Sequence, residues 1–178
     1  LTIFRIHNAI DPNIFQYSSE KKKQIAFSTN KNYDDLVQVI NILKFRGTIA
    51  DYQLVPISAK SEKEVAEILK ESSIFLSFVN GEGFGLLAAE AMSCGCIVVG
   101  YDGMGGKEFF NTSFCYPVQQ PDVINFAKNV EKVISAYEKN PDLIRAQAKK
   151  ASVFINSTYS LQKEESDIVA VWTKLLNQ

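Results

Sequence analysis

Two glutamates and a glycine-rich turn form the part of this chain best suited to chemistry. Glu82 and Glu90 stand eight positions apart within the stretch Gly81–Gly95. The apolar run 74–79 before them has the length of a strand, and good helix formers follow the turn. A strand, a glycine turn and a helix in this order direct free backbone N–H groups at the space above the strand, which suits a phosphate. We therefore expect two carboxylates that flank an anion site.

Strand-like and helix-like runs alternate along the chain. Strands are predicted at 25–28, 52–57, 74–79, 96–100 and 114–118, and helices at 34–46, from Ser61, through Met92, at 123–137, from Pro141 and from about Ser160. This order predicts an α/β, Rossmann-like open parallel sheet with helices on both faces, in a single domain. Ligands of such sheets bind at the carboxyl ends of the strands. A second glycine-rich loop at 101–106 should reach that edge too, so that both loops face one pocket.

Composition excludes several classes of protein. A net charge of -1 argues against a nucleic-acid partner, which requires a basic footprint. No apolar run approaches the roughly 20 residues of a transmembrane segment, and no signal-peptide pattern is present. Three cysteines are too few for a disulfide framework, so we expect a reducing, cytoplasmic location, free or peripheral at the inner membrane face. Because the chain starts at Leu1 rather than Met, we expect a piece of a longer protein.

The glutamate segment resembles a known signature. The pattern E-G-F-G-L-x-x-x-E-A-M-x-x-G-C-x-V-V, with Glu82 and Glu90 as its acids, is similar to the E-x7-E motif of retaining GT-B glycosyltransferases, group 1, family 4-like. His7–Phe15 resembles the start of the C-terminal domain of that family, and Gly100–Glu108 resembles the loop after its next strand. The resemblance covers roughly residues 6 to 118.

This resemblance implies a donor-binding domain that transfers a sugar from a nucleotide diphosphate sugar to an acceptor hydroxyl, with retention of the anomeric configuration. The implied catalytic residues are Glu82, which would bond hydroxyls of the donor sugar, and Lys31, which would neutralise the diphosphate. Glu90 would hold the ribose hydroxyls. The implied donor-binding residues are Gly83, Phe84, Gly85, Leu86, Glu90, Gly105 and Gly106. Contacts to the base are expected around 55–59. No metal and no cofactor are implied.

The rest of the enzyme would lie outside this chain. An absent N-terminal domain would bind the acceptor, which is a glycan, a lipid or a small molecule. The fragment alone should then be nearly inactive, and the helix over 160–178 should pack partly on that domain. One departure from the family concerns charge, because the stretch 28–32 offers Lys31 but lacks the usual arginine. Lys107 is a second cation that could assist. A non-catalytic or degenerate nucleotide-sugar-binding module stays the alternative.

Three other classes fit the residues less well. Gly81, Gly83 and Gly85 give G-x-G-x-G rather than the G-x-G-x-x-G of a dinucleotide domain. A P-loop is excluded, since Glu108 follows Gly106-Lys107 where a Ser or Thr is required. Glycosidases need two acids about 5–9.5 Å apart across a bond. An acid in a turn and another along the following helix are poorly placed for that reaction.

Overall fold

The computed structural model describes residues 3–177. Its strands are β1 (Lys22–Ser28), β2 (Gln53–Ile57), β3 (Ser72–Glu82), β4 (Ile97–Met104) and β5 (Tyr116–Pro117). Its helices are α1 (Tyr33–Phe45), α2 (Glu62–Glu71), α3 (Leu86–Ser93), the short 3-10 helix η1 (Gly105–Glu108), α4 (Val123–Lys139), α5 (Pro141–Thr158) and α6 (Leu161–Leu176). The strands form one parallel sheet in the order β2-β1-β3-β4-β5. The predicted α/β class is therefore confirmed.

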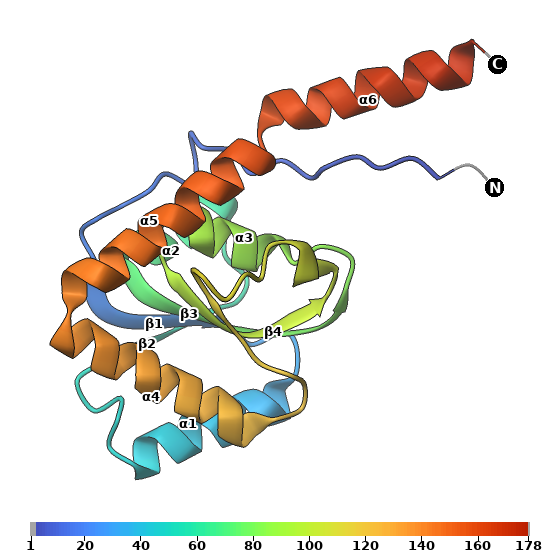
Figure 1. The fold of residues 1–178 in the computed structure, drawn as a ribbon. Helices are drawn as coiled ribbons and strands as arrows, with labels where there is room; N and C mark the ends of the chain where they lie inside the picture. Colours follow the sequence, from blue (N-terminus) through green and yellow to red (C-terminus); the bar gives the residue numbers. More distant parts are fainter. Residues whose placement is uncertain (1–2, 178) are drawn as a thin grey trace.

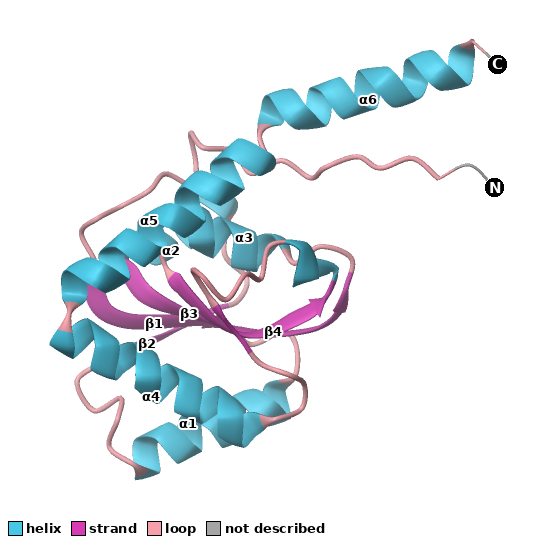
Figure 2. Ribbon diagram, in the orientation of Figure 1, coloured by secondary structure: helices cyan, strands magenta, loops and turns pink. Residues whose placement is uncertain are grey.

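Helices cover both faces of this sheet (Figures 1 and 2). Side chains of β4 alternate between two cores: Val98 joins the core under α2, α3 and α5, whereas Ile97 and Val99 join the core under α1 and α4. Two-sided burial explains why this strand reads as a continuous apolar run rather than an alternating one. β3 and β4 are thus buried strands that position the loops at their carboxyl ends.

Local signals set the starts of several helices as expected. Ser61 and Glu64 form a reciprocal capping box at α2, with the Ser61 backbone N–H donating to the Glu64 carboxylate over 2.8 Å. Asn140 caps α5, and Pro141 occupies the first turn of that helix. Ser160 caps α6 by accepting from the backbone N–H of Lys163.

Several strand bounds differ from the prediction, most clearly in β3, β4 and β5. β4 continues through Met104 instead of ending at Gly100, because it stays paired with β3 up to the partners Glu82 and Met104. Glu82 is therefore the last residue of a strand and not a residue of a free turn. β5 is shorter than predicted, with only Tyr116 and Pro117 paired to β4.

α6 projects away from the sheet and the helices packed on its two faces, and the N-terminal segment runs beside it (Figure 1). Within the described part of α6 no residue is buried. The segment is tied to this helix by His7, whose Nδ1 and backbone N–H both bond the Asp167 carboxylate at 2.6 and 3.1 Å. The backbone N–H of Ala9 donates to Glu164 in the same way. The helix is thus attached through polar contacts at one side, while apolar residues of its other sides are exposed.

Candidate functional site

The carboxyl end of β1, the end of β3 and the first turn of α3 meet at one edge of the sheet. Lys31 follows β1, and Glu82 ends β3. Because β1 and β3 are neighbours in the sheet, these two side chains come together although they are 51 positions apart. The structure therefore brings the two predicted catalytic residues into direct contact.

Lys31 Nζ donates to Glu82 Oε1 in an ion pair. The side chain of Lys31 is 46% exposed and that of Glu82 is 24% exposed. Ion pairs that water reaches in this way contribute about 0–1 kcal/mol. A ligand with a stronger negative charge can therefore take Lys31 from Glu82 at little cost, which frees the carboxylate to accept hydrogen bonds.

The first turn of α3 presents backbone donors beside this pair. Gly85 is the N-cap at φ 91°, and no side chain caps the helix. Ala88 and Ala89 already donate to the Gly85 carbonyl. Within residues 3–177, the N–H groups of Leu86 and Leu87 donate no hydrogen bond. Uncapped N–H groups and the helix dipole favour an anion at this position.

A hollow of about 570 Å³ lies over this turn, and we call it the α3 hollow. It is lined by Asn8, Lys31 and Gly81–Leu87. Phe84 contributes backbone here, because its ring is buried against Phe109 and Tyr159 at centroid distances of 5.0 Å each. The predicted donor-binding stretch 83–86 therefore forms one continuous wall of the hollow. The packed rings of Phe84, Phe109 and Tyr159 support its backbone.

Glu90 lies one turn further along α3 and faces a different hollow of about 390 Å³, here called the Glu90 hollow. This hollow also contains Ser58, Ala59 and Lys60, which include the end of the stretch expected to contact a base. Leu87 lines both the α3 hollow and the Glu90 hollow, so the two adjoin. The site is thus long enough for an extended ligand with an anionic middle.

Partial burial raises the pKa of Glu90 to about 7, and the nearby Glu62 carboxylate adds to this effect. Within the described residues the Glu90 carboxylate accepts no hydrogen bond, although it is half-buried. A carboxylate without donors in a low-dielectric hollow is well suited to accept two hydrogen bonds from a vicinal diol. Glu62 was not predicted for this site, because only the position of α2 across from α3 brings it there.

The second glycine-rich loop packs against the first but does not open onto the same hollow. A Cβ on Gly105 would stand 2.1 Å from the carbonyl oxygen of Gly83, so the two loops touch through backbone. Gly106 is buried beside Phe110. Neither Gly105 nor Gly106 lines the α3 hollow. The two loops thus line separate hollows rather than the single one expected, with Lys107 in the second, and a donor contact by Gly105 and Gly106 stays a prediction.

Two negative findings apply to residues 3–177. No group of three or more His, Cys, Asp or Glu side chains is arranged to hold a metal ion. None of the described helices combines the length and apolar character required to cross a membrane.

Comparison with known proteins agrees with this architecture. A curated relative, the alpha-1,6-glucosyltransferase of Actinobacillus pleuropneumoniae serotype 7 (strain AP76), is 32% identical over 95 residues. The matched part is 52% of this chain and 29% of that protein, so the chain spans under a third of the relative's length.

Solved structures show the same fold at low sequence identity. The C-terminal domain of the glycosyl transferase group 1 family protein LpcC from Francisella tularensis matches with a TM-score of 0.68 at 16% identity, over 86% of this chain and 100% of that one. Anabaena HepE in complex with UDP and glucose matches with a TM-score of 0.69 at 11% identity, over 95% of this chain and 56% of HepE.

The family model described as glycosyl transferases group 1 matches residues 53–150, which is more than half of the chain. That range holds Glu82, Glu90 and both glycine-rich loops. This chain therefore belongs to the glycosyl transferases group 1 family, and it shares its fold with these solved structures.

Proposed function

We propose that this chain is the donor-binding domain of a retaining glycosyltransferase that uses a nucleoside diphosphate hexose. One observation carries the proposal: the Lys31–Glu82 pair stands beside the uncapped first turn of α3, with Glu90 in the adjoining hollow. A cation with backbone donors, flanked by two carboxylates, matches a diphosphate with a sugar on one side and a ribose on the other.

In this proposal each group has one role in binding. The diphosphate lies on the N–H groups of Leu86 and Leu87 and draws Lys31 away from Glu82. Glu82 then accepts hydrogen bonds from hydroxyls of the donor sugar, and Glu90 accepts them from the ribose. Preorganised donors at the diphosphate would stabilise the charge that develops on the leaving group. Retention of configuration and a reaction without a metal are parts of the same proposal.

UDP-glucose is the first donor to test. HepE was solved with UDP and glucose, and the curated relative is named a glucosyltransferase.

The remaining part of the proposal concerns the acceptor, a glycan, lipid or small molecule. We propose that it binds mainly to another domain, on which α6 packs through its exposed apolar residues, among them Trp172 and Leu176 at 58% and 78% exposure. By itself this chain would then transfer sugar very slowly.

Isothermal titration with UDP, GDP and ADP tests the donor site. We expect one nucleotide to bind, with weaker binding by Glu90→Ala and Lys31→Ala. Lys63→Ala and Glu67→Ala are matched controls on α2, where both side chains are exposed. Loss of one charge-assisted contact should weaken binding about tenfold or more.

Each result has a defined meaning. Binding that neither substitution weakens would refute the assigned site. Absence of binding by all three nucleotides would contradict a donor site on this chain. A chain that binds a nucleotide while the full-length protein transfers no sugar would instead support the alternative, a binding module that lacks catalysis because the diphosphate arginine is missing.

A further inference from the structure

A third hollow lies at the same edge of the sheet, beyond the candidate donor site. It has a volume of about 350 Å³ and is formed by Tyr101–Met104 at the end of β4, Lys107 of η1, Pro117 of β5 and the residues 118–120 that follow it. We call it the β4 hollow. It shares no lining residue with the α3 hollow or the Glu90 hollow. The proposed function assigns it no role.

Polar side chains of the β4 hollow are largely free of partners. Within residues 3–177, the side chains of Lys107, Gln119 and Gln120 make no hydrogen bond and no ion pair, and all three are exposed. Asp102 uses Oδ1 to accept from the Met104 backbone N–H at 2.9 Å, and its Oδ2 has no such contact. Two amides, a carboxylate and an ammonium group together supply donors and acceptors in nearly equal measure.

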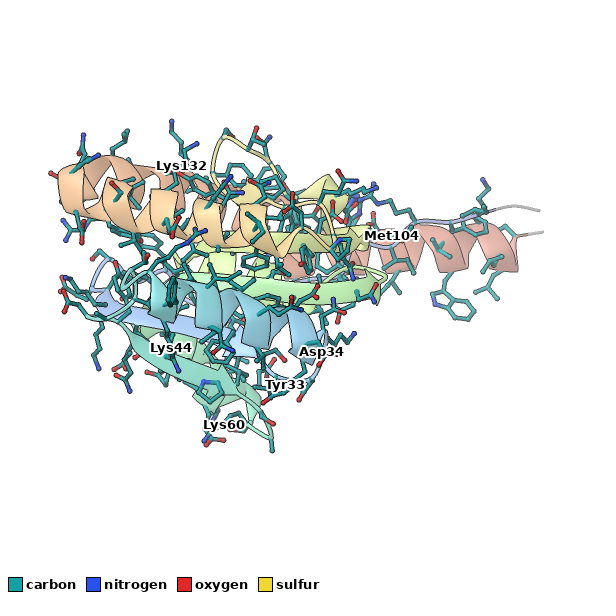
Figure 3. All side chains as sticks on the ribbon, turned by 90° about the horizontal axis from the view of Figure 1, so that it is seen from below. Tyr33, Asp34, Lys44, Lys60, Met104 and Lys132 are labelled. Atoms are coloured by element: carbon teal, nitrogen blue, oxygen red, sulfur yellow. The ribbon has the colours of Figure 1, made fainter. Side chains whose placement is uncertain are left out.

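Met104 adds an apolar surface at the rim. Its side chain is 72% exposed, at the end of the sheet (Figure 3). Its φ of 73° is a conformation that favours glycine and that costs a non-glycine residue backbone strain. The pairing of Met104 with Glu82 and the contact to Asp102 hold it there. Together with Pro117, it gives the hollow one apolar wall beside its polar groups.

The order of strands fixes where this hollow lies relative to the donor. The Glu90 hollow contains residues that follow β2 and β1, Glu82 ends β3, and the β4 hollow lies at the ends of β4 and β5. A nucleotide sugar that runs from Glu90 to Glu82 therefore points its sugar toward the β4 hollow. This step rests on the proposed function.

We propose that the β4 hollow binds a saccharide, as a subsite for a sugar unit of the acceptor. Hydroxyl groups of a sugar both donate and accept, which suits Asp102, Lys107 and Gln119 together, and its C–H face suits Met104. A purely anionic ligand is disfavoured by the carboxylate of Asp102, and a purely cationic one by Lys107. The domain would thus contribute to both sides of the transfer.

Backbone amide NMR spectra of the 178-residue chain test this subsite. Glucose, isomaltose and N-acetylglucosamine are titrated separately, with and without UDP. We expect at least one saccharide to shift the amide signals of Asp102, Gly103 and Gln119. UDP should instead shift those of Leu86 to Glu90. If none of the three saccharides shifts signals of the β4 hollow, the inference is overturned, whatever UDP does.

This experiment distinguishes a failure of the proposed donor site from a failure of the proposed saccharide subsite. Absence of UDP shifts would contradict the donor site, while saccharide shifts at the β4 hollow would still support a saccharide site there. Shifts by UDP with no saccharide response would leave the donor site standing and refute the subsite.

A matched pair of variants assigns any binding to the side chains. Gln119→Met removes the amide but keeps the length of the side chain, and it should weaken saccharide binding about fivefold with an unchanged Kd for UDP. Gln53→Met, on an exposed residue at the start of β2, should change neither. Saccharide affinity that is unchanged in both Gln119→Met and Lys107→Met would contradict the proposal.

Discussion

Replacement of Glu90 by glutamine should stabilise the free domain at alkaline pH and weaken the nucleotide binding proposed for it. Partial burial and Glu62 raise the pKa of Glu90 from its ordinary value of 4.5 to about 7. The folded state then binds this proton more tightly than the unfolded state does. The stabilising contribution is present in full below about pH 4.5 and is lost as the pH rises toward 7. Above that range the folded domain bears the cost of an ionised, half-buried carboxylate.

The magnitude follows from the two pKa values. A difference of about 2.5 corresponds to about 3 kcal/mol. Water reaches part of the hollow and the Lys60 ammonium lines it, so we expect about 1–3 kcal/mol. Glu90→Gln removes this cost because it keeps the shape of the side chain without the charge. Its free energy of unfolding should exceed that of the wild type by this amount near pH 8 and match it near pH 4.5.

Urea denaturation of both proteins at the two pH values measures the effect. Glu67→Gln on α2 is the control, since the Glu67 side chain is 72% exposed and should show no such pH dependence. Equal stability of Glu90→Gln and wild type near pH 8 would refute the claim that burial raises the pKa of Glu90. The same variant should bind the nucleotide about tenfold more weakly than wild type, because one charge-assisted contact is lost. Wild-type affinity should rise between about pH 6 and about pH 8, because the ribose hydroxyls are best held by the ionised form.

Four further outcomes are expected. Lys31→Met should weaken nucleotide binding about tenfold in calorimetry and lower the free energy of unfolding by less than about 1 kcal/mol, because its partner Glu82 is accessible to water. Gly105→Ala should destabilise the domain by about 1–3 kcal/mol in urea denaturation, whereas Gly83→Ala, with open space around its Cβ, should change little. Removal of α6 from Leu161 onward should leave the melting temperature almost unchanged, and a collapse would show that the helix packs locally. Sugar transfer by the full-length protein should continue in EDTA, and loss of activity that Mg²⁺ or Mn²⁺ restores would contradict a metal-free reaction.

Periodicity and capping signals predicted most elements because these signals are local. The capping box at Ser61 and the proline after Asn140 mark helix starts through contacts within one turn. The end of β4 was not predicted, since Gly100 to Met104 read as a loop. Their strand conformation depends on pairing with β3, a partner that no short window contains.

The sequence named residues for the candidate site but not their arrangement in space. Resemblance to the family named Glu82, Glu90 and Lys31, and the motif that holds both acids falls within the matched region. The contact between Lys31 and Glu82 follows from β1 lying beside β3, which the order of elements along the chain does not fix. The proximity of Glu62 to Glu90 has the same origin.

The exposed position of α6 also makes its tryptophan a fluorescent reporter of contacts made by this helix. Trp172 is the only tryptophan of the chain, and its side chain is 58% exposed on a helix without buried residues. Fluorescence emission of an indole shifts to shorter wavelength when it leaves water. Burial of Trp172 by another domain of the protein or by another molecule should therefore shift the intrinsic fluorescence emission to shorter wavelength. Changes in that contact on nucleotide binding can then be followed without a label.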